Sequence, residues 1–99
     1  FELRAGSPPT VHDTALFARL AAPLALAWGS ALDTTPYRGM FSEDFAFYTG
    51  TIPALYFGWG IARGPFGFAG VHSADFTVHP AALVEGVRFL ATLAETATQ

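Results

Sequence analysis

Apolar residues in the first third of the chain recur at the three- and four-residue spacing of an α-helix. They are Leu16, Phe17, Leu20, Leu24 and Trp28. Asp13 precedes them and can cap the start of the helix, and Gly29 suits its end. Pro23 lies inside this stretch, where its missing N–H and its ring predict a kink or a break.

Three other segments have patterns typical of β-strands. Residues 1–4 alternate between apolar and polar, and Pro8 and Pro9 follow where a strand would end. Residues 31–35 form a plausible short strand before Pro36. Residues 53–57 are continuously apolar up to Gly58, which predicts a strand buried on both faces.

Two further helices are expected. Ser42 can cap a short helix, with Glu43 and Asp44 in its first turn, where unpaired amides and the helix dipole favour negative charge. Pro80 fits the first turn of a final helix, and Gly86 would permit close packing against it. The apolar face predicted for that helix consists of Leu83, Val87, Leu90 and Ala94. Strands and helices thus alternate, which predicts an α/β sheet.

A glycine-rich loop follows the predicted buried strand. Five glycines occur from Gly58 to Gly70 inclusive, and the segment His72-Ser73-Ala74-Asp75-Phe76 comes directly afterwards. Sites in open α/β sheets lie at the carboxyl ends of strands, so this loop is a candidate site. It is not a phosphate loop, because no Lys-Ser or Lys-Thr pair follows the glycines.

Composition narrows the possible partners. The 99 residues are 52% hydrophobic with a net charge of -3, and the five basic residues are scattered, so neither a nucleic acid nor an anionic membrane surface is expected. The apolar runs are broken well short of the roughly 20 residues that cross a bilayer, so a soluble, cytoplasmic protein is expected. Cysteine is absent, which leaves His, Asp and Glu as possible metal ligands.

Two features suggest a piece of a larger protein. The chain opens directly in the predicted strand, and only 13% of its residues are charged whereas 15% are aromatic. A small domain with so little charge should cover part of its apolar surface with other polypeptide. A processing site would explain the first feature equally well, and an oligomer interface the second.

Several segments together resemble the M20 metallopeptidases, especially the branch of N-acyl-amino-acid and hippurate-type amidohydrolases. The segments are Ser-Glu-Asp-Phe at 42–45, Ile-Pro-Ala-Leu-Tyr-Phe-Gly at 52–58 and His-Ser-Ala-Asp-Phe at 72–76. Residues 8–13 are similar to the family's return from lid domain to catalytic domain. The segments occur in the family's order over nearly the whole chain, which makes the resemblance more specific than any one of them.

The resemblance implies an α/β catalytic domain of zinc-peptidase type with an inserted lid domain. Residues 1–7 would be the last strand of the lid or dimerisation domain, and residues 8–99 the C-terminal part of the catalytic domain. The intact enzyme would bind two divalent metal ions (zinc, or manganese or cobalt) and form a homodimer through the lid. Metal-activated water would cleave N-acyl amino acids or related small amides or peptides.

The family's late metal-binding histidine falls on His72. The catalytic base, a glutamate, and most metal ligands belong to the N-terminal half of such an enzyme, and nothing in this chain replaces them. No catalytic residue is therefore assigned here, and the chain is expected to be inactive without the missing N-terminal half.

Each candidate residue has a simpler alternative. His72 could merely cap a turn, although the flanking motif favours a metal ligand. Asp75 could support the ligand by a hydrogen bond or lie in solvent. Glu43 and Asp44 could line the substrate cleft or support the metal ligands, or could act only on the helix dipole, and these interpretations weigh equally.

The chain departs from the family pattern at three positions. Phe41 replaces the usual glycine and could narrow the cleft, Ala74 replaces a proline, and His79 replaces an acidic residue or asparagine. His12 and His79 are most simply surface or capping residues.

Two functions of other classes are alternatives to the hydrolase. One is a non-catalytic α/β interaction module that binds a partner through its apolar face. The other is an esterase using Ser73 beside His72, which is disfavoured because adjacent side chains point in different directions and no Gly-x-Ser-x-Gly elbow occurs.

Overall fold

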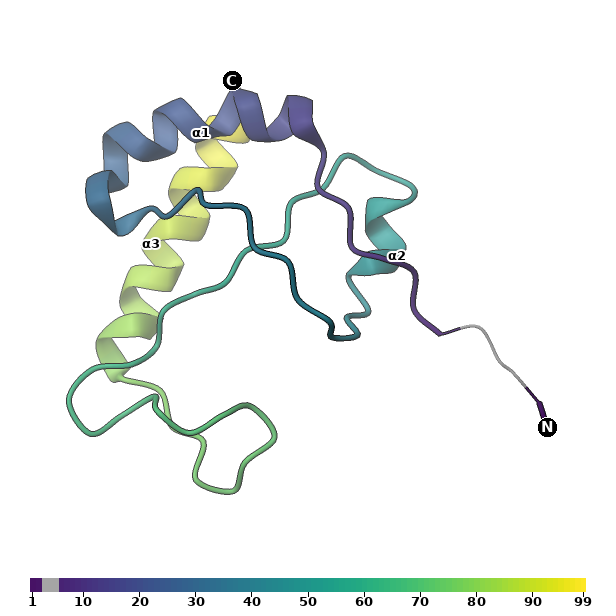
Figure 1. Cartoon of the computed structure of the whole chain (residues 1–99). Helices are drawn as coiled ribbons and strands as arrows, with labels where there is room; N and C mark the ends of the chain where they lie inside the picture. The colour runs from purple at the N-terminus through teal and green to yellow at the C-terminus, as the bar shows by residue number, and fades with distance from the viewer. Residues whose placement is uncertain (3–5) are drawn as a thin grey trace. The chain divides into compact units, whose positions relative to one another are not determined.

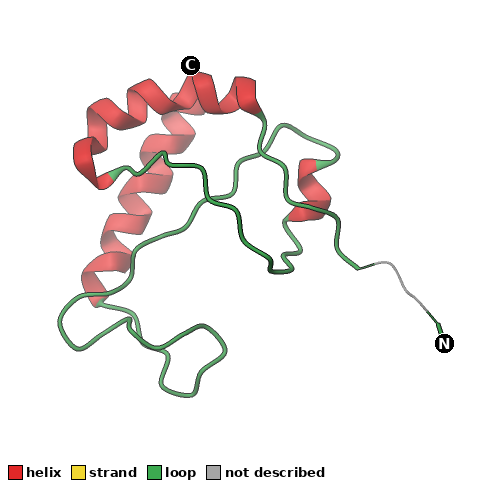
Figure 2. Cartoon of the chain, in the orientation of Figure 1, coloured by secondary structure: helices red, strands yellow, loops and turns green. Residues whose placement is uncertain are grey.

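The computed structural model describes residues 1–2 and 6–99, and its regular structure in these residues is helical (Figures 1 and 2). Helix α1 spans Thr14–Trp28 and continues into the 3-10 turn η1, Gly29–Ala31. Helix α2 is a single turn, Ala46–Thr49, and helix α3 spans Pro80–Ala97. The first and last helices are confirmed close to the predicted positions.

The predicted α/β sheet is wrong for the described residues. They contain no strand, and the only β-bridge among them is the isolated pair Arg63 and Phe66. Residues 32–35 and 53–57 lack regular structure. Residues 3–5, which include part of the predicted first strand and of the predicted lid segment 1–7, lie outside the described residues. A buried apolar run becomes a strand only beside another strand that shares its hydrogen bonds. Here the Ala54 carbonyl instead accepts from the backbone N–H of Asp13 over 3.0 Å.

Helix α1 has the ends that its sequence predicts. Asp13 Oδ1 accepts a 2.6 Å hydrogen bond from the backbone N–H of Leu16. Gly29 closes the helix with a φ of 54°, and its N–H donates to the Ala25 carbonyl. This φ suits glycine, which has no Cβ to clash. Pro23 lies inside the helix without breaking it, so of the predicted kink or break the break is wrong and the kink stays a prediction.

Helix α1 and η1 together form a longer apolar stretch than was expected from the sequence. The 18 residues Thr14–Ala31 have a mean hydropathy of 1.2, and 11% of them are buried. By length and composition this stretch could cross a membrane. The core helix of a water-soluble protein meets the same two criteria, so the property does not identify a membrane protein.

The chain divides into two compact units, residues 1–57 and residues 58–99. The buried apolar residues of the first unit are Leu20, Leu24, Ala46 and Ala54. In the second unit Phe89 of α3 is buried, and its ring centroid lies 5.2 Å from that of Trp59.

Trp59 packs on a face of α3 different from the predicted one. Its indole Nε1 donates to the Ala82 carbonyl over 2.9 Å, and its ring lies beside Gly86. The residues of the predicted apolar face are exposed, with Val87 69% exposed. Close packing at Gly86 is confirmed, whereas burial of the Leu83 and Val87 face is not.

Candidate functional site

The glycine-rich segment of the second unit forms a loop that is tied at its base. The backbone N–H of His79 donates to the Ile61 carbonyl over 3.1 Å, which joins the two ends of residues 61–79. Inside the loop, the backbone N–H of Gly67 donates to Thr77 Oγ1 over 3.1 Å. A compact loop with close ends is a common scaffold for functional residues.

Gly67 is the position at which this loop requires glycine. Its φ is 79°, and a Cβ there would lie 2.5 Å from the Ile61 carbonyl oxygen and 2.6 Å from Ala62 Cα. Both atoms belong to the backbone and have no rotamer by which to move away. Just before it, Arg63 and Phe66 exchange two backbone hydrogen bonds of 3.1 and 3.2 Å and form a tight turn.

His72 lies on an exposed turn in the same loop. The turn is closed by a 3.3 Å hydrogen bond from the backbone N–H of Ser73 to the Gly70 carbonyl. His72 is the third residue of this turn, and its φ of 66° is the only positive value among the described non-glycine residues. A side chain in this left-handed region costs roughly 1–2 kcal/mol, so glycine would be expected here.

Asp75 belongs to the next turn of the loop. The backbone N–H of Phe76 donates to the Ser73 carbonyl over 3.2 Å, and that of Asp75 donates to Ser73 Oγ over 3.3 Å. The structure thus brings His72 and Asp75 into consecutive turns of one exposed segment. In the described part of the chain no hydrogen bond links their side chains, so the supporting role predicted for Asp75 remains a prediction.

Glu43 and Asp44 lie before α2 in the first unit. The Ser42 cap is wrong, because α2 begins at Ala46 and its N-cap residue is Phe45, which makes no side-chain cap bond. Two hydrogen bonds nevertheless fix the Glu43 carboxylate. Its Oε2 accepts a 3.1 Å hydrogen bond from the Tyr56 hydroxyl, and its Oε1 accepts a 3.3 Å bond from the backbone N–H of Phe45.

Tyr56 is a partner of Glu43 that the sequence analysis missed. The hydrogen bond to the Glu43 carboxylate raises the pKa of the Tyr56 hydroxyl, and desolvation adds to the effect. Aromatic rings surround this pair: the Tyr56 ring centroid lies 5.5 Å from that of Phe45 and 6.3 Å from that of Phe41. The only hint in the sequence was a phenol within an otherwise apolar run.

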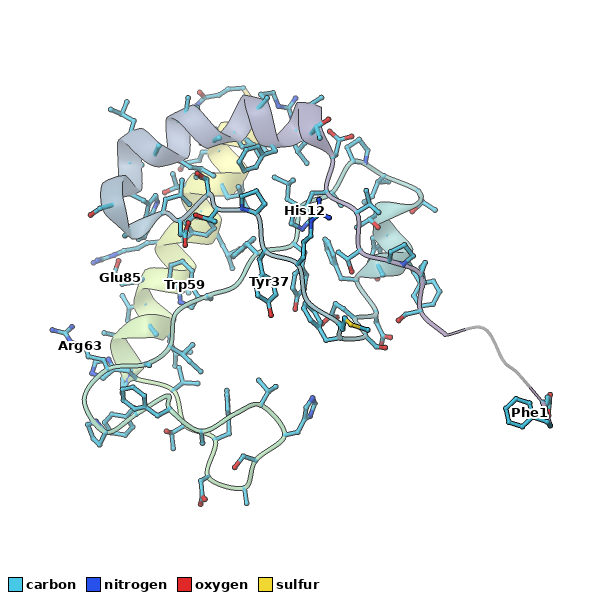
Figure 3. The ribbon with its side chains drawn as sticks, in the orientation of Figure 1. Phe1, His12, Tyr37, Trp59, Arg63 and Glu85 are labelled. Carbon is cyan, nitrogen blue, oxygen red and sulfur yellow. The ribbon has the colours of Figure 1, made fainter. Side chains whose placement is uncertain are left out.

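Two hollows on the described part of the surface contain none of the predicted site residues. One, of about 340 Å³ in the first unit, is lined by Val11, His12, Asp13, Thr49, Gly50, Thr51, Ile52 and Pro53. The other, of about 180 Å³ in the second unit, is lined by Trp59, Gly60, Ile61, Ala62, Arg63, His79, Ala81, Ala82 and Glu85. Figure 3 labels Trp59, Arg63 and Glu85 from the second set.

A model of the peptidase family M20/M25/M40 matches residues 1–96, almost the whole chain. The chain belongs to this family. No solved structure matches the chain. The family match supports a hydrolase of peptidase type.

M20 family proteins generally bind divalent metal ions. The described residues contain no group of three or more His, Cys, Asp or Glu that could hold a metal ion. Among the predicted residues only His72 offers an imidazole. The predicted site residues do not form a metal site among themselves.

The four predicted M20 site residues are divided between the units. Glu43 and Asp44 belong to residues 1–57, and His72 and Asp75 belong to residues 58–99. Glu43 and Asp44 are neighbours in sequence, and His72 and Asp75 lie in consecutive turns. The grouping of both pairs around one cleft remains a prediction.

Proposed function

We propose that this chain is part of a metal-dependent amidohydrolase that cleaves N-acyl amino acids or related small amides or peptides. The M20 family match supports hydrolysis of this kind, and the Ser-Glu-Asp-Phe and His-Ser-Ala-Asp-Phe segments support the N-acyl-amino-acid branch. In this proposal the 99 residues alone are inactive, because the remaining metal ligands and the catalytic base come from other polypeptide of the same enzyme.

The conformation of His72 is the observation that carries the site assignment. An exposed turn residue that only linked two segments could be glycine, which adopts a φ of 66° without strain. An imidazole is kept there at an energetic cost, and strained residues of this kind cluster at functional sites. A neutral imidazole is also a common ligand of zinc, manganese and cobalt. We therefore assign His72 as one metal ligand of the assembled enzyme.

The assignment of the carboxylates follows from how they are held. Glu43 is fixed by two donors, Tyr56 Oη and the Phe45 N–H, and is only partly exposed. A fixed carboxylate suits a residue that lines a substrate cleft, because its orientation is set before the substrate binds. Asp44 and Asp75 are exposed, which leaves their side chains accessible to substrate or to ligand-supporting contacts.

The test is to combine this chain with the N-terminal portion of its own gene product and to assay hydrolysis of N-acyl amino acids with added zinc or manganese. We expect activity in the combination, none with the 99 residues alone, and a loss of at least about 100-fold in His72→Ala, as for loss of a metal-site group. The matched control is His12→Ala, an exposed histidine in the first unit, which should retain activity.

Two results would contradict these assignments in different ways. Full activity in His72→Ala, with unchanged metal content, would remove His72 from the metal site but leave the hydrolase intact. A folded combination that binds metal but hydrolyses no amide would contradict the proposed reaction. That second result would favour a non-catalytic interaction module, which the exposed apolar side chains of α3 would then serve.

A further inference from the structure

Aromatic rings form a row beside the Glu43 carboxylate in the first unit. Neighbouring rings in this row have centroids 5.5 to 6.3 Å apart. In order of contact, the rings belong to Tyr37, Phe41, Tyr56, Phe45 and Tyr48. Figure 3 labels Tyr37, at one end of the row. The hydroxyl of Tyr56, the middle ring, donates to Glu43 Oε2 over 3.1 Å, so the carboxylate lies beside the middle of the aromatic row.

The outer rings of the aromatic row are open to solvent. Tyr37 is 80% exposed, Tyr48 59% and Phe41 55%. A contiguous group of exposed apolar side chains marks an interaction site, whereas single exposed ones do not. The face of an aromatic ring also carries partial negative charge, which attracts cations. The row therefore offers a cation both apolar contact and favourable electrostatics.

Negative charge accompanies the aromatic row. The two groups that donate to Glu43, a phenol hydroxyl and a backbone N–H, are uncharged. Among the described residues no arginine forms an ion pair with Glu43 or with the exposed Asp44. Arg38 is the one basic residue in positions 33–56, against three carboxylates, and in the described part of the chain it makes no ring contact. This segment is net negative, which favours a cation at the rings.

Gly39 allows the two outer rings Tyr37 and Phe41 to lie together. A Cβ at Gly39 would lie 2.6 Å from Phe41 Cε1 and 2.8 Å from Tyr37 Cε1. The two rings thus close over a residue without a side chain, and their planes meet at 29°. Any other residue at this position would push the rings away from their present places. The outer half of the aromatic row therefore depends on glycine between its two rings.

We propose that the aromatic row and Glu43 form a binding site for a quaternary ammonium group. The methyl groups of such a cation contact ring faces, and its charge is attracted by those faces and by the carboxylate. It donates no hydrogen bond, which suits a carboxylate whose two oxygens already accept from Tyr56 and Phe45. This site goes beyond the proposed hydrolysis, because binding of the cation requires neither a metal ion nor an amide.

The experiment is an NMR titration of the whole chain with tetramethylammonium chloride and, separately, with tert-butanol. The two probes present similar methyl groups, but only the first is charged. Sodium chloride keeps the ionic strength constant and supplies a strongly hydrated cation for comparison. The ring protons of Tyr37, Phe41 and Tyr56 report binding. We expect tetramethylammonium to bind about fivefold to thirtyfold more tightly than tert-butanol, the scale of cation–π attraction.

Two variants separate the contributions of charge and ring. Glu43→Gln keeps an acceptor for the Tyr56 hydroxyl but removes the charge, and should weaken tetramethylammonium binding about twofold to fivefold. Phe41→Leu keeps an apolar side chain but removes a ring, and should weaken it by a similar factor. The matched control is Phe68→Leu, which removes an exposed ring of the second unit and should leave the affinity unchanged.

The ratio of the two affinities decides the proposal. Equal affinities of the unmodified chain for both probes would show a plain apolar surface, and no binding of either probe would show no site, so each result would overturn the proposal. The same holds if tetramethylammonium binds undiminished to both Glu43→Gln and Phe41→Leu. The comparison of probes on the unmodified chain needs no substitution, so it remains decisive even if a variant fails to fold.

Discussion

The Tyr56 hydroxyl donates a 3.1 Å hydrogen bond to Oε2 of Glu43, across 13 positions of sequence. The other carboxylate oxygen of Glu43 accepts from the backbone N–H of Phe45, two residues away. The apolar run of residues 53–57 was predicted to be a strand, yet in this structure it delivers a phenol to the Glu-Asp segment. An apolar segment without strand partners can still fix a polar side chain, and that contact gives the first prediction.

Glu43→Gln should lower the pKa of Tyr56 towards 10.0, the ordinary value for tyrosine. The anionic acceptor raises the pKa because it stabilises the protonated phenol. In the unmodified chain the stability from this contact is present below the pKa of the unfolded chain and is lost as the pH rises through the higher folded value. Near-ultraviolet absorbance of the phenolate during a pH titration would measure the change.

Tyr56→Phe is the control for that titration, because it removes the phenol and keeps the ring contacts with Phe41 and Phe45. It should abolish the high-pH component of the absorbance change. An identical titration curve for the Glu43→Gln variant and the unmodified chain would show that the carboxylate does not influence the phenol.

His72→Gly should be more stable than His72→Ala. Alanine at a φ of 66° retains the left-handed strain of about 1–2 kcal/mol, whereas glycine avoids it at an entropic cost of about 0.5–1 kcal/mol. The expected difference in free energy of unfolding is about 0.5–1 kcal/mol, measured by urea denaturation. At Val71, which lacks a positive φ, the order should reverse: the Val71→Gly variant should be less stable than the Val71→Ala variant. The same order of stability for the glycine and alanine variants at both positions would argue against strain at His72.

Local signals in the sequence predicted the two long helices. Asp13 caps α1 as expected, Pro80 occupies the first turn of α3, and His79, predicted to be a surface or capping residue, caps α3. These features succeed because a helix closes its hydrogen bonds within a few residues, so the required groups are near one another in sequence.

Local signals of this kind do not show whether the predicted strands pair into a sheet. The apolar run at residues 53–57 predicts burial, but pairing also requires a second strand, which need not lie nearby in sequence or on the same polypeptide. The candidate site stays a prediction, and some of its features could not be predicted for a related reason. The motif around His72 pointed to the residue, but the contact between Glu43 and Tyr56 joins residues 13 positions apart and is not visible in the local sequence.

Gly67→Ala should damage the loop far more than Gly64→Ala. Both glycines have positive φ, 79° and 60°, so alanine is strained at either position by about 1–2 kcal/mol. A Cβ at Gly64 meets open space, whereas one at Gly67 would lie 2.5 Å from the Ile61 carbonyl oxygen. The expected loss of unfolding free energy is about 1 kcal/mol for Gly64→Ala and more than about 3 kcal/mol for Gly67→Ala. Urea denaturation would compare them, and equal losses would contradict the close approach of Gly67 to Ile61.

Gly86→Ala tests the packing of Trp59 on α3. Glycine inside a helix is less favourable than alanine by about 0.8–1 kcal/mol, so the substitution should stabilise α3 if the new methyl group fits. Its Cβ would lie 3.4 Å from Trp59 Nε1 and 3.6 Å from Cε2, distances of ordinary contact. We therefore expect a gain of up to about 1 kcal/mol in the free energy of unfolding.

The Trp59→Phe variant separates the hydrogen bond of Trp59 from the packing of its ring on α3. It loses the 2.9 Å hydrogen bond to the Ala82 carbonyl and should cost about 0.5–1.5 kcal/mol, while retaining an aromatic ring beside Phe89. Combining it with Gly86→Ala should leave the gain from alanine intact, because the smaller ring gives the methyl group more room. A destabilising Gly86→Ala that becomes stabilising beside phenylalanine would instead show that the indole packs too tightly on α3 to admit a methyl group.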